Sequence, residues 1–254
     1  MSLVLIDIDA ETGVATVTLN DPDRRNVFTN EMNEALIPVV AELEADDRVG
    51  AMVITGAGPH FSAGGHLDDL LGASSNEEMH AIYSGFLAVA HSSLATVAAV
   101  NGAAVGAGMN CALACDLIIA GEKSRFDSRF LQIAIHPGGG HTWRLRNKTD
   151  IQTAKAMVLF SEVLFGPQAK DVGLAWDCVA DDQILARAQE LAAKAAAAPK
   201  ELVARTKASL NASFAITESQ ASVDLEVDPQ VWSMAQPEFK DLVARLKANI
   251  AARK

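Results

Sequence analysis

Two glycine-rich turns carry the residues of this sequence that are best suited to chemistry. One covers residues 56–67 and follows an apolar stretch at 51–55; the other contains Gly106 and Gly108 and follows an apolar stretch at 96–100. Glycine permits positive φ and leaves room for a ligand to approach the backbone. If each turn directs one N–H at a shared point, the pair forms an oxyanion hole, which stabilises an oxygen that becomes negatively charged. Tight packing of a helix on a sheet explains either turn equally well.

Titratable and polar side chains stand in or beside these turns. His66 and Asp68 begin the helical segment after the first turn, where a carboxylate is favoured by the helix dipole alone. His141 follows the Pro137–Gly140 turn and enters a helix. Imidazole titrates near neutral pH and is therefore a candidate acid or base, although a structural hydrogen bond accounts for His66 equally well.

Alternating strand and helix signals predict the elements that position these residues. Alternation of apolar and polar residues predicts a β-hairpin from 3–9 and 14–19, and Thr29 or Asn30 can cap a helix that runs to about residue 47. Further strands are expected at 51–55, 96–100 and 116–120, and further helices at about 77–93, after Gly108 and at 186–198. Strands separated by helices predict βαβ crossovers and a mostly parallel sheet, hence an α/β fold. Beyond about residue 150 the chain reads as nearly all helical.

Composition excludes several classes of function. The net charge of −11 argues against nucleic-acid binding, which requires a basic surface. No apolar run reaches the length of a membrane span, so we expect a soluble, cytoplasmic protein that does not bind membranes. The three cysteines are expected to be buried thiols, and Cys111 and Cys115 have no histidine near them to complete a metal site. A hydrophobic content of 50% indicates that some apolar surface is buried between subunits.

Four segments, in order along the chain, resemble the signature segments of the enoyl-CoA hydratase/isomerase (crotonase) superfamily. They are Pro22–Asn26, Phe61–Gly65, Asn101–Gly108 and Pro137–Leu145. The resemblance implies a crotonase-like core of ββα spiral turns over residues 1–195 and a C-terminal helical trimerisation region over 196–254. It further implies a homotrimer or a dimer of trimers, and an acyl-CoA or enoyl-CoA thioester as substrate. Coenzyme A enters only as part of that substrate, and no other cofactor and no metal are expected.

The same resemblance assigns site residues. It places the two oxyanion N–H donors on Gly65 and Ala107. The residues expected to contact the substrate or its CoA moiety are Arg24, Arg25, Val27, Ala63, Gly65, Leu67, Asp68, Phe130, Leu242 and Arg245. For Arg24 and Arg25 a solvated loop is the alternative, and for Arg245 it is a solvated helix face.

Both catalytic glutamates of the family's hydratases are replaced in this sequence, by Asn110 and Phe130. Hydration requires carboxylates that activate water and move a proton. Asn110 can orient water but cannot take its proton, and Phe130 can do neither. The sequence therefore predicts an acyl-CoA enzyme that stabilises a thioester enolate by isomerase-like or other non-hydratase chemistry, with His66, Asn110 and His141 as candidate catalytic side chains.

Two other functions compete with this enzyme. The first is a catalytically silent protein that binds acyl-CoA in the same pocket, which the absence of both glutamates favours. The second is a nucleotide-binding dehydrogenase. The dehydrogenase is disfavoured because the Gly56-Ala-Gly58 turn lacks a third glycine three residues later, where Phe61 stands.

Overall fold

A six-stranded sheet forms the centre of the first of two compact units in the computed structural model, which describes residues 2–251. This unit covers Met1–Ala197, and the second covers Ala198–Lys254. In the order β1-β2-β3-β5-β7-β10, the strands are Val4–Asp9, Val14–Leu19, Ala51–Gly56, Ala95–Val100, Leu117–Gly121 and Asp177–Val179. The β1–β2 hairpin is antiparallel and every other neighbouring pair is parallel, as the sequence predicts.

A second, four-stranded sheet gives the unit its repeating pattern. In the order β4-β6-β8-β9, its strands are His60–Ser62, Ala103–Val105, Arg125–Asp127 and Leu164–Phe165. Each of β3, β5 and β7 in the main sheet is followed by a short strand of this second sheet and then by helical structure. This is the ββα spiral expected from the resemblance. Strands β9 and β10 lie beyond residue 150, so the prediction of a nearly all-helical second half was wrong there; runs of two and three residues are too short to show a strand period.

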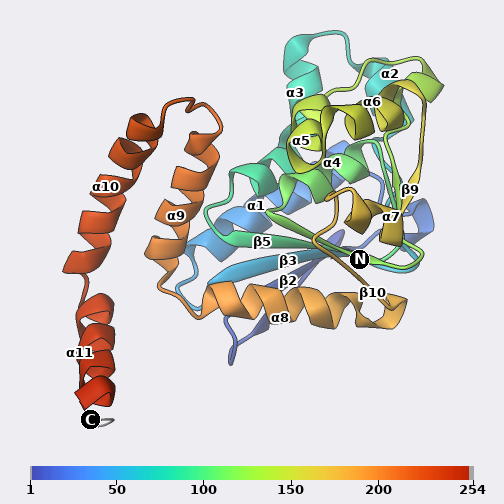
Figure 1. The fold of residues 1–254 in the computed structure, drawn as a ribbon. Helices are drawn as coiled ribbons and strands as arrows, with labels where there is room; N and C mark the ends of the chain where they lie inside the picture. Colours follow the sequence, from blue (N-terminus) through green and yellow to red (C-terminus); the bar gives the residue numbers. More distant parts are fainter. Residues whose placement is uncertain (1, 252–254) are drawn as a thin grey trace. The chain divides into compact units, whose positions relative to one another are not determined.

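Helices cover both faces of the main sheet (Figure 1). Those of the first unit are α1 to α8: Asn30–Ala45, Leu67–Gly72, Asn76–His91, Ala107–Ala114, His141–Lys148, Ile151–Leu159, Gly166–Asp171 and Ile184–Ala196. Short 3₁₀ helices occupy Pro22–Arg24, Phe130–Ile133 and Asp181–Gln183. The strand residues alternate between two cores: Val53 and Val97 pack with α8, whereas Met52 and Ile54 pack in the larger core with α1, α3 and α4. Period-2 alternation thus sorts the apolar side chains to opposite faces.

The helix ends follow local side-chain chemistry. Thr29 caps α1 by accepting a hydrogen bond from the N–H of Met32 at 3.1 Å, as predicted. Helix α1 ends two residues earlier than the sequence predicts, because the Asp46 carboxylate binds the backbone and side chain of Arg48 and the backbone of Asp46 is extended. All eight residues of α4 are buried, which makes this helix the centre of the unit.

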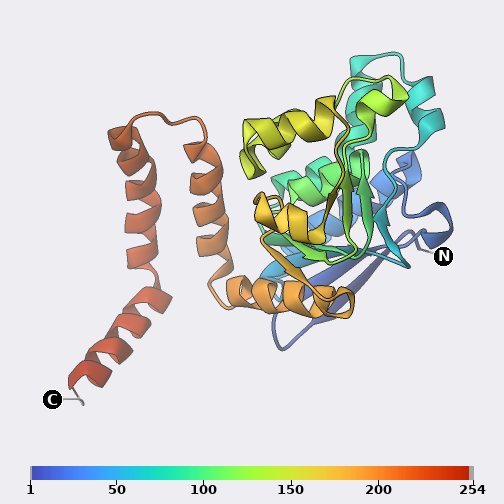
Figure 2. The same ribbon diagram turned by 45° about the vertical axis from the view of Figure 1, so that its right-hand side comes forward.

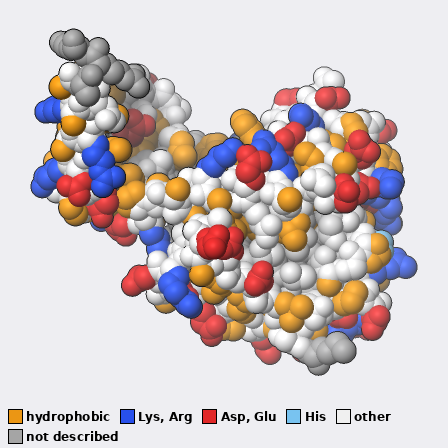
Figure 3. Space-filling model, turned by 90° about the horizontal axis from the view of Figure 1, so that it is seen from below, with side chains coloured by type: hydrophobic (Ala, Val, Ile, Leu, Met, Phe, Trp, Pro, Cys, Tyr) orange, Lys and Arg blue, Asp and Glu red, His pale blue; other side chains and the backbone are white. Residues whose placement is uncertain are grey.

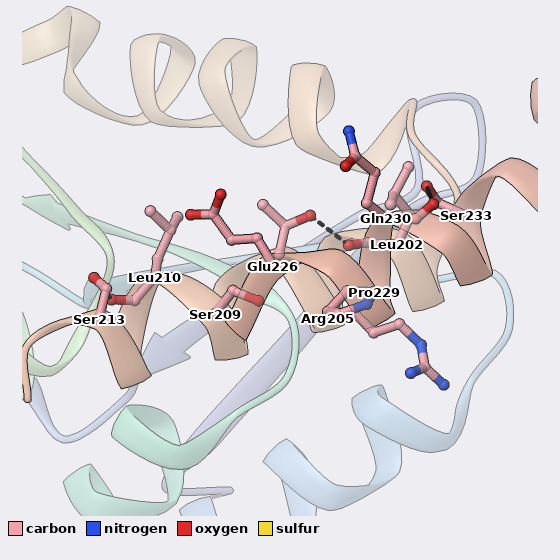
Figure 4. Close-up of a pocket in the computed structure, with 10 residues that line it drawn as sticks. Leu202, Arg205, Ser209, Leu210, Ser213, Glu226, Pro229, Gln230 and Ser233 are labelled. Atoms are coloured by element: carbon pink, nitrogen blue, oxygen red, sulfur yellow. Dashed lines mark hydrogen bonds between the residues drawn. The ribbon is translucent and has the colours of Figure 1, made fainter. Parts of the chain in front are cut away.

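The second unit consists of three helices, α9 (Lys200–Ser213), α10 (Ser219–Ala235) and α11 (Pro237–Ala251). Helices α9 and α10 lie side by side (Figure 2). Leu202 and Leu210 from α9 and Pro229 and Gln230 from α10 help to line a shallow groove of about 320 Å³ between them (Figure 4). No residue predicted for the site lines this groove, so the candidate site must be built elsewhere.

Candidate active site

The two glycine-rich turns are held against each other by one side chain. Asn101, directly after β5, donates from Nδ2 to the carbonyl oxygens of Gly56 at 2.8 Å and Gly58 at 2.9 Å. Its Oδ1 accepts from the N–H of Gly56 at 3.1 Å. Because all three bonds cross from the second turn to the first, the amide fixes the relative positions of the two turns.

The backbone of the first turn presents one N–H toward the second turn. Gly64, at φ +113°, accepts from the N–H of Phe28 at 2.8 Å, and His66 donates to the carbonyl oxygen of Phe28 at 2.9 Å. Successive residues of an extended chain direct their polar groups to opposite sides, so the N–H of Gly65 points away from Phe28. A Cβ built on Gly65 would lie 3.7 Å from the Cβ of Ala107, so these two residues are neighbours.

The second N–H belongs to the first turn of α4. Gly106 has φ +50°, a conformation that favours glycine, and Ala107 is the first residue of the helix. Its N–H therefore has no acceptor within the helix and carries part of the positive end of the helix dipole. Within residues 2–251, neither this N–H nor that of Gly65 donates a hydrogen bond. Two neighbouring residues thus each have an unpaired backbone donor, and the role of these donors as an oxyanion hole stays a prediction.

Next to this pair lies a buried chain of three side chains. His141 Nδ1 is 2.8 Å from Asn110 Oδ1, and His141 Nε2 is 2.8 Å from Ser128 Oγ. Asn110 Nδ2 donates to the carbonyl oxygen of Gly138 at 3.0 Å. Ser128, His141 and Asn110 are each at most 2% exposed. The structure therefore brings together two of the predicted catalytic side chains, Asn110 and His141, and adds a serine to them.

The imidazole of His141 is neutral at pH 7. Burial, assisted by the positive charge of Arg144, lowers the pKa of His141 from 6.5 to about 4. The Phe130 ring packs against the imidazole edge-on, with 4.9 Å between ring centroids. Phe130 thus covers the histidine and contributes an apolar wall beside it.

His66, the third candidate side chain, pairs with carboxylates at the start of α2. Its Nδ1 is 3.4 Å from Asp69 Oδ1, and its Nε2 is 3.9 Å from Asp68 Oδ2. The carboxylate of Asp69 also accepts from the backbone N–H of Asn30 at 3.2 Å. His66 follows Gly65 directly, but its side chain belongs to this surface cluster and not to the buried chain of Asn110 and His141.

The residues expected to bind CoA lie in several places. The loop of Arg24 and Arg25 borders the first turn, because the N–H of Ala63 donates to the carbonyl oxygen of Arg25 at 2.9 Å. Arg24 forms a 2.7 Å ion pair with Asp21 and both arginines are exposed. Among the others, Val27 is half-buried, Leu67 and Asp68 are exposed, and Leu242 and Arg245 are exposed on α11 of the second unit.

Sequence reasoning missed two residues that shape the site. Asn26 is fully buried and donates from Nδ2 to the carbonyl oxygens of Ala57 and His60 at 2.9 and 2.8 Å, which holds the loop of Arg24 and Arg25 against the first turn. The positive φ of 55° at Asn26, a conformation that asparagine tolerates, fits its place in the Arg-Arg-Asn turn. Ser128 carries no such signal, because a single serine after a short strand is unremarkable in sequence.

Features that would point to other chemistry are absent from the described part of the chain. No group of three His, Cys, Asp or Glu side chains among residues 2–251 is arranged to hold a metal ion. None of its helices is long and apolar enough to cross a membrane. Cys111 and Cys115 are buried and form no disulfide, as predicted, whereas Cys178 is only half-buried; burial raises the pKa of Cys111. Acidic and basic side chains are interspersed over the face seen in Figure 3.

The repeated ββα turns and the paired amides define a class of protein, the crotonase-like fold. The crystal structure of an enoyl-CoA hydratase from Mycobacterium smegmatis is similar over 98% of this chain and 97% of that chain, with a TM-score of 0.89 and 25% sequence identity. This likeness establishes the predicted fold class over both units.

Sequence comparison places the chain within that class. The family model described as enoyl-CoA hydratase/isomerase matches residues 9–246. The probable enoyl-CoA hydratase EchA14 of Mycobacterium tuberculosis is 44% identical over 253 residues, covering 96% of each chain. The 1,2-epoxyphenylacetyl-CoA isomerase of Escherichia coli is 30% identical over 250 residues, covering 94% of each chain. The chain therefore belongs to the enoyl-CoA hydratase/isomerase family, which sets aside the nucleotide-binding dehydrogenase.

Proposed function

We propose that this protein is an enzyme that binds an acyl-CoA or enoyl-CoA thioester with its carbonyl oxygen between the N–H groups of Gly65 and Ala107. The observation that carries the proposal is the adjacency of these two unpaired donors at the start of a buried helix. As an enolate forms, the oxygen gains negative charge and both hydrogen bonds strengthen. One donor in such a site typically contributes about 3–4 kcal/mol to transition-state stabilisation.

The proposed chemistry is isomerisation of the acyl chain or another non-hydratase reaction. The Asn110 amide uses one acceptor site toward His141 and one N–H toward Gly138, and an amide does not take a proton from water. Phe130 offers no group that takes a proton. Moving a proton from one carbon to another along an enolate needs fewer catalytic groups than adding water does. The isomerase from Escherichia coli among the relatives supports this direction.

Recognition of the CoA moiety is proposed for the loop of Arg24 and Arg25 and for α11. The loop is exposed and bonded to the first glycine turn, so its cations can meet phosphate groups despite the net charge of −11. Helix α11 presents Leu242 and Arg245, an apolar and a basic side chain, to solvent. Its exposed apolar residues, with those of α10, support assembly as a homotrimer or a dimer of trimers; they include Val227, Val231, Leu242, Leu246 and Ile250.

A second function, acyl-CoA binding without turnover, is favoured by one observation. His141, a buried titratable side chain near the paired amides, has both ring nitrogens engaged by protein groups and is neutral at pH 7. With neither imidazole nitrogen free to take a proton from a ligand, a thioester bound between the amides is left unchanged by this residue.

Isotope exchange separates these functions. Enoyl-CoA esters of several chain lengths are incubated in D₂O, and deuterium in the acyl chain is measured by mass spectrometry, together with hydration and double-bond migration. Isomerisation predicts deuterium incorporation and migration with little hydration. Tight calorimetric binding of every ester without exchange supports the silent binder, and hydration as the fastest reaction contradicts the proposed chemistry.

A further inference from the structure

The most distinctive feature beside the paired amides is the row of hydrogen-bonded side chains Ser128, His141 and Asn110. A hydroxyl, an imidazole and an orienting acceptor in line, with contacts of 2.8 Å at both ends of the imidazole, have the geometry of an activated nucleophile. We infer that Ser128 is a nucleophile that accepts the acyl group of the thioester, which gives the protein a thioester-cleaving activity. This inference rests on the proposed binding of the thioester carbonyl at Gly65 and Ala107.

The orientation of Asn110 determines the proton positions along this line. Its Nδ2 donates to the carbonyl oxygen of Gly138, which can only accept, so its Oδ1 faces His141. The Nδ1 of His141 must then carry the proton, and Nε2 is left with a lone pair. Ser128 therefore donates its hydroxyl proton to Nε2. An asparagine turned the other way would force the opposite tautomer, in which the imidazole cannot serve as the base for serine.

The imidazole can reach a substrate only through Ser128. Both of its nitrogens are engaged, the Phe130 ring packs against it, and its exposed fraction is 1%. The Ser128 hydroxyl, by contrast, has no other hydrogen-bond partner within residues 2–251. Any proton that His141 exchanges with a bound ligand must therefore pass through the serine oxygen.

The backbone places Ser128 beside the oxyanion donors. Strand β8 pairs with β6 so that Asp127 lies opposite Val105, and the N–H of Gly106 donates to the carbonyl oxygen of Asp127 at 2.9 Å. Ser128 follows Asp127, just as Ala107 follows Gly106. Asn110 is on the same helix as Ala107, within its first turn. The nucleophile, its base and the donor of Ala107 thus converge at the start of α4.

The reaction balances with water as its only co-reactant. Ser128 Oγ attacks the thioester carbonyl carbon while its proton moves to His141 Nε2, and the oxygen of the tetrahedral intermediate is held by the two amides. The C–S bond then breaks, and the thiolate of CoA takes the proton from His141. Water attacks the acyl-serine ester with His141 again as base, and the proton returns to Ser128 Oγ. The products are a carboxylic acid and CoA with a free thiol.

Asn110 acts in this scheme as a positioning residue. Its neutral amide sets the tautomer of His141 but supplies no negative charge for the imidazolium that forms during attack. We therefore expect a slow reaction in the natural protein. The Asn110→Asp variant adds that charge at the same position and should accelerate acylation and shift its pH profile, which a purely structural hydrogen bond would not do.

Acylation is tested with two measurements on the same samples. Binding of a non-cleavable thioether analogue of acyl-CoA is measured by calorimetry. Acylation is followed with the matching thioester by release of the CoA thiol and by intact-protein and peptide mass spectrometry after acid quenching. The variants are Ser128→Ala, Ser128→Cys, which keeps a nucleophile, and the control Ser84→Ala, which removes a serine that bonds only to Ala81 within α3.

We expect an acyl adduct on the peptide that contains Ser128, kept in Ser84→Ala and Ser128→Cys and lost in Ser128→Ala. Thiol release should fall by about 10³-fold or more in Ser128→Ala while analogue binding stays unchanged. Binding of the analogue without an adduct or thiol release, or thiol release by Ser128→Ala at the unmodified rate, overturns the role of Ser128 and leaves the proposed function standing. Failure to bind the analogue overturns both.

Discussion

Replacement of Ala107 by proline removes one proposed oxyanion donor while keeping the helix that carries it. Ala107 is the first residue of α4, where the N–H has no partner in the helix. Proline is favoured at that position because its fixed φ suits a helix start and no helix hydrogen bond is lost. Gly106, the preceding residue, has the conformational freedom to accommodate the ring. The substitution therefore tests the loss of the N–H donor while the fold is kept.

The expected loss follows from the number of donors. Two backbone N–H groups share the oxygen, and removing one such donor costs about 3–4 kcal/mol of transition-state stabilisation. At 1.36 kcal/mol per decade, this is a fall in kcat of roughly 10²–10³-fold. The proline ring also occupies space beside the nitrogen, so substrate binding weakens as well, and the rate must be compared at saturating thioester.

The assay measures kcat for deuterium exchange and for thiol release, with thermal unfolding as a check on the fold. Ile151→Pro is the matched control, because Ile151 is likewise the first residue of a helix, α6, after the cap residue Asp150. We expect the control to keep its kcat within about twofold, since its N–H lies outside the candidate site. An Ala107→Pro protein with a normal melting temperature and a kcat within about threefold of the unmodified value would refute the oxyanion assignment.

Two further substitutions test the framework of the site. Asn101→Ala removes three hydrogen bonds between the glycine turns, and at about 1 kcal/mol each the free energy of unfolding in urea should fall by about 3 kcal/mol. The control is the half-buried Asn20→Ala, which removes one side-chain hydrogen bond elsewhere. A change in Asn101→Ala below about 1 kcal/mol and equal to that of the control contradicts the role of Asn101 in holding the turns together. His141 has its pKa lowered from 6.5 to about 4 by burial, so the unfolded chain binds the extra proton between these values. The free energy of unfolding that this shift contributes is complete above pH 6.5, and about 3 kcal/mol of it is lost as the pH is lowered to 4. In His141→Gln this loss should be absent, and a pH profile equal to that of the unmodified protein would contradict the buried, neutral state of His141.

The central strands of the main sheet could be predicted because they are apolar over most of their length. Every residue of β3 is buried, and β5 is buried from Thr96 onward, so each reads as a short continuous apolar run between turn signals. Strands β4, β6 and β8 are three residues each and carry no period of their own. Their existence followed only from the family resemblance, and β9 and β10 were missed altogether.

The backbone of the candidate site could be predicted from the sequence, whereas its hydrogen-bonded side chains could not. The assignment of Gly65 and Ala107 came from their places in the two glycine-rich segments that resemble those of the family, and the structure brings these two residues next to each other. Ser128, Asn110 and His141 come from three separate segments and meet only through tertiary packing.

Even knowing that these three residues meet does not determine their chemistry. That depends on which face Asn110 turns toward His141, and the decision is made by a backbone carbonyl, that of Gly138, in the turn before α5. Every residue has a backbone carbonyl, so the sequence does not indicate which of them will accept this hydrogen bond. The family's motifs therefore do not by themselves determine the reaction of a member. In this protein the carbonyl oxygen of Gly138 lies inside one of the four signature segments, yet the residue types of that segment do not show that it orients Asn110.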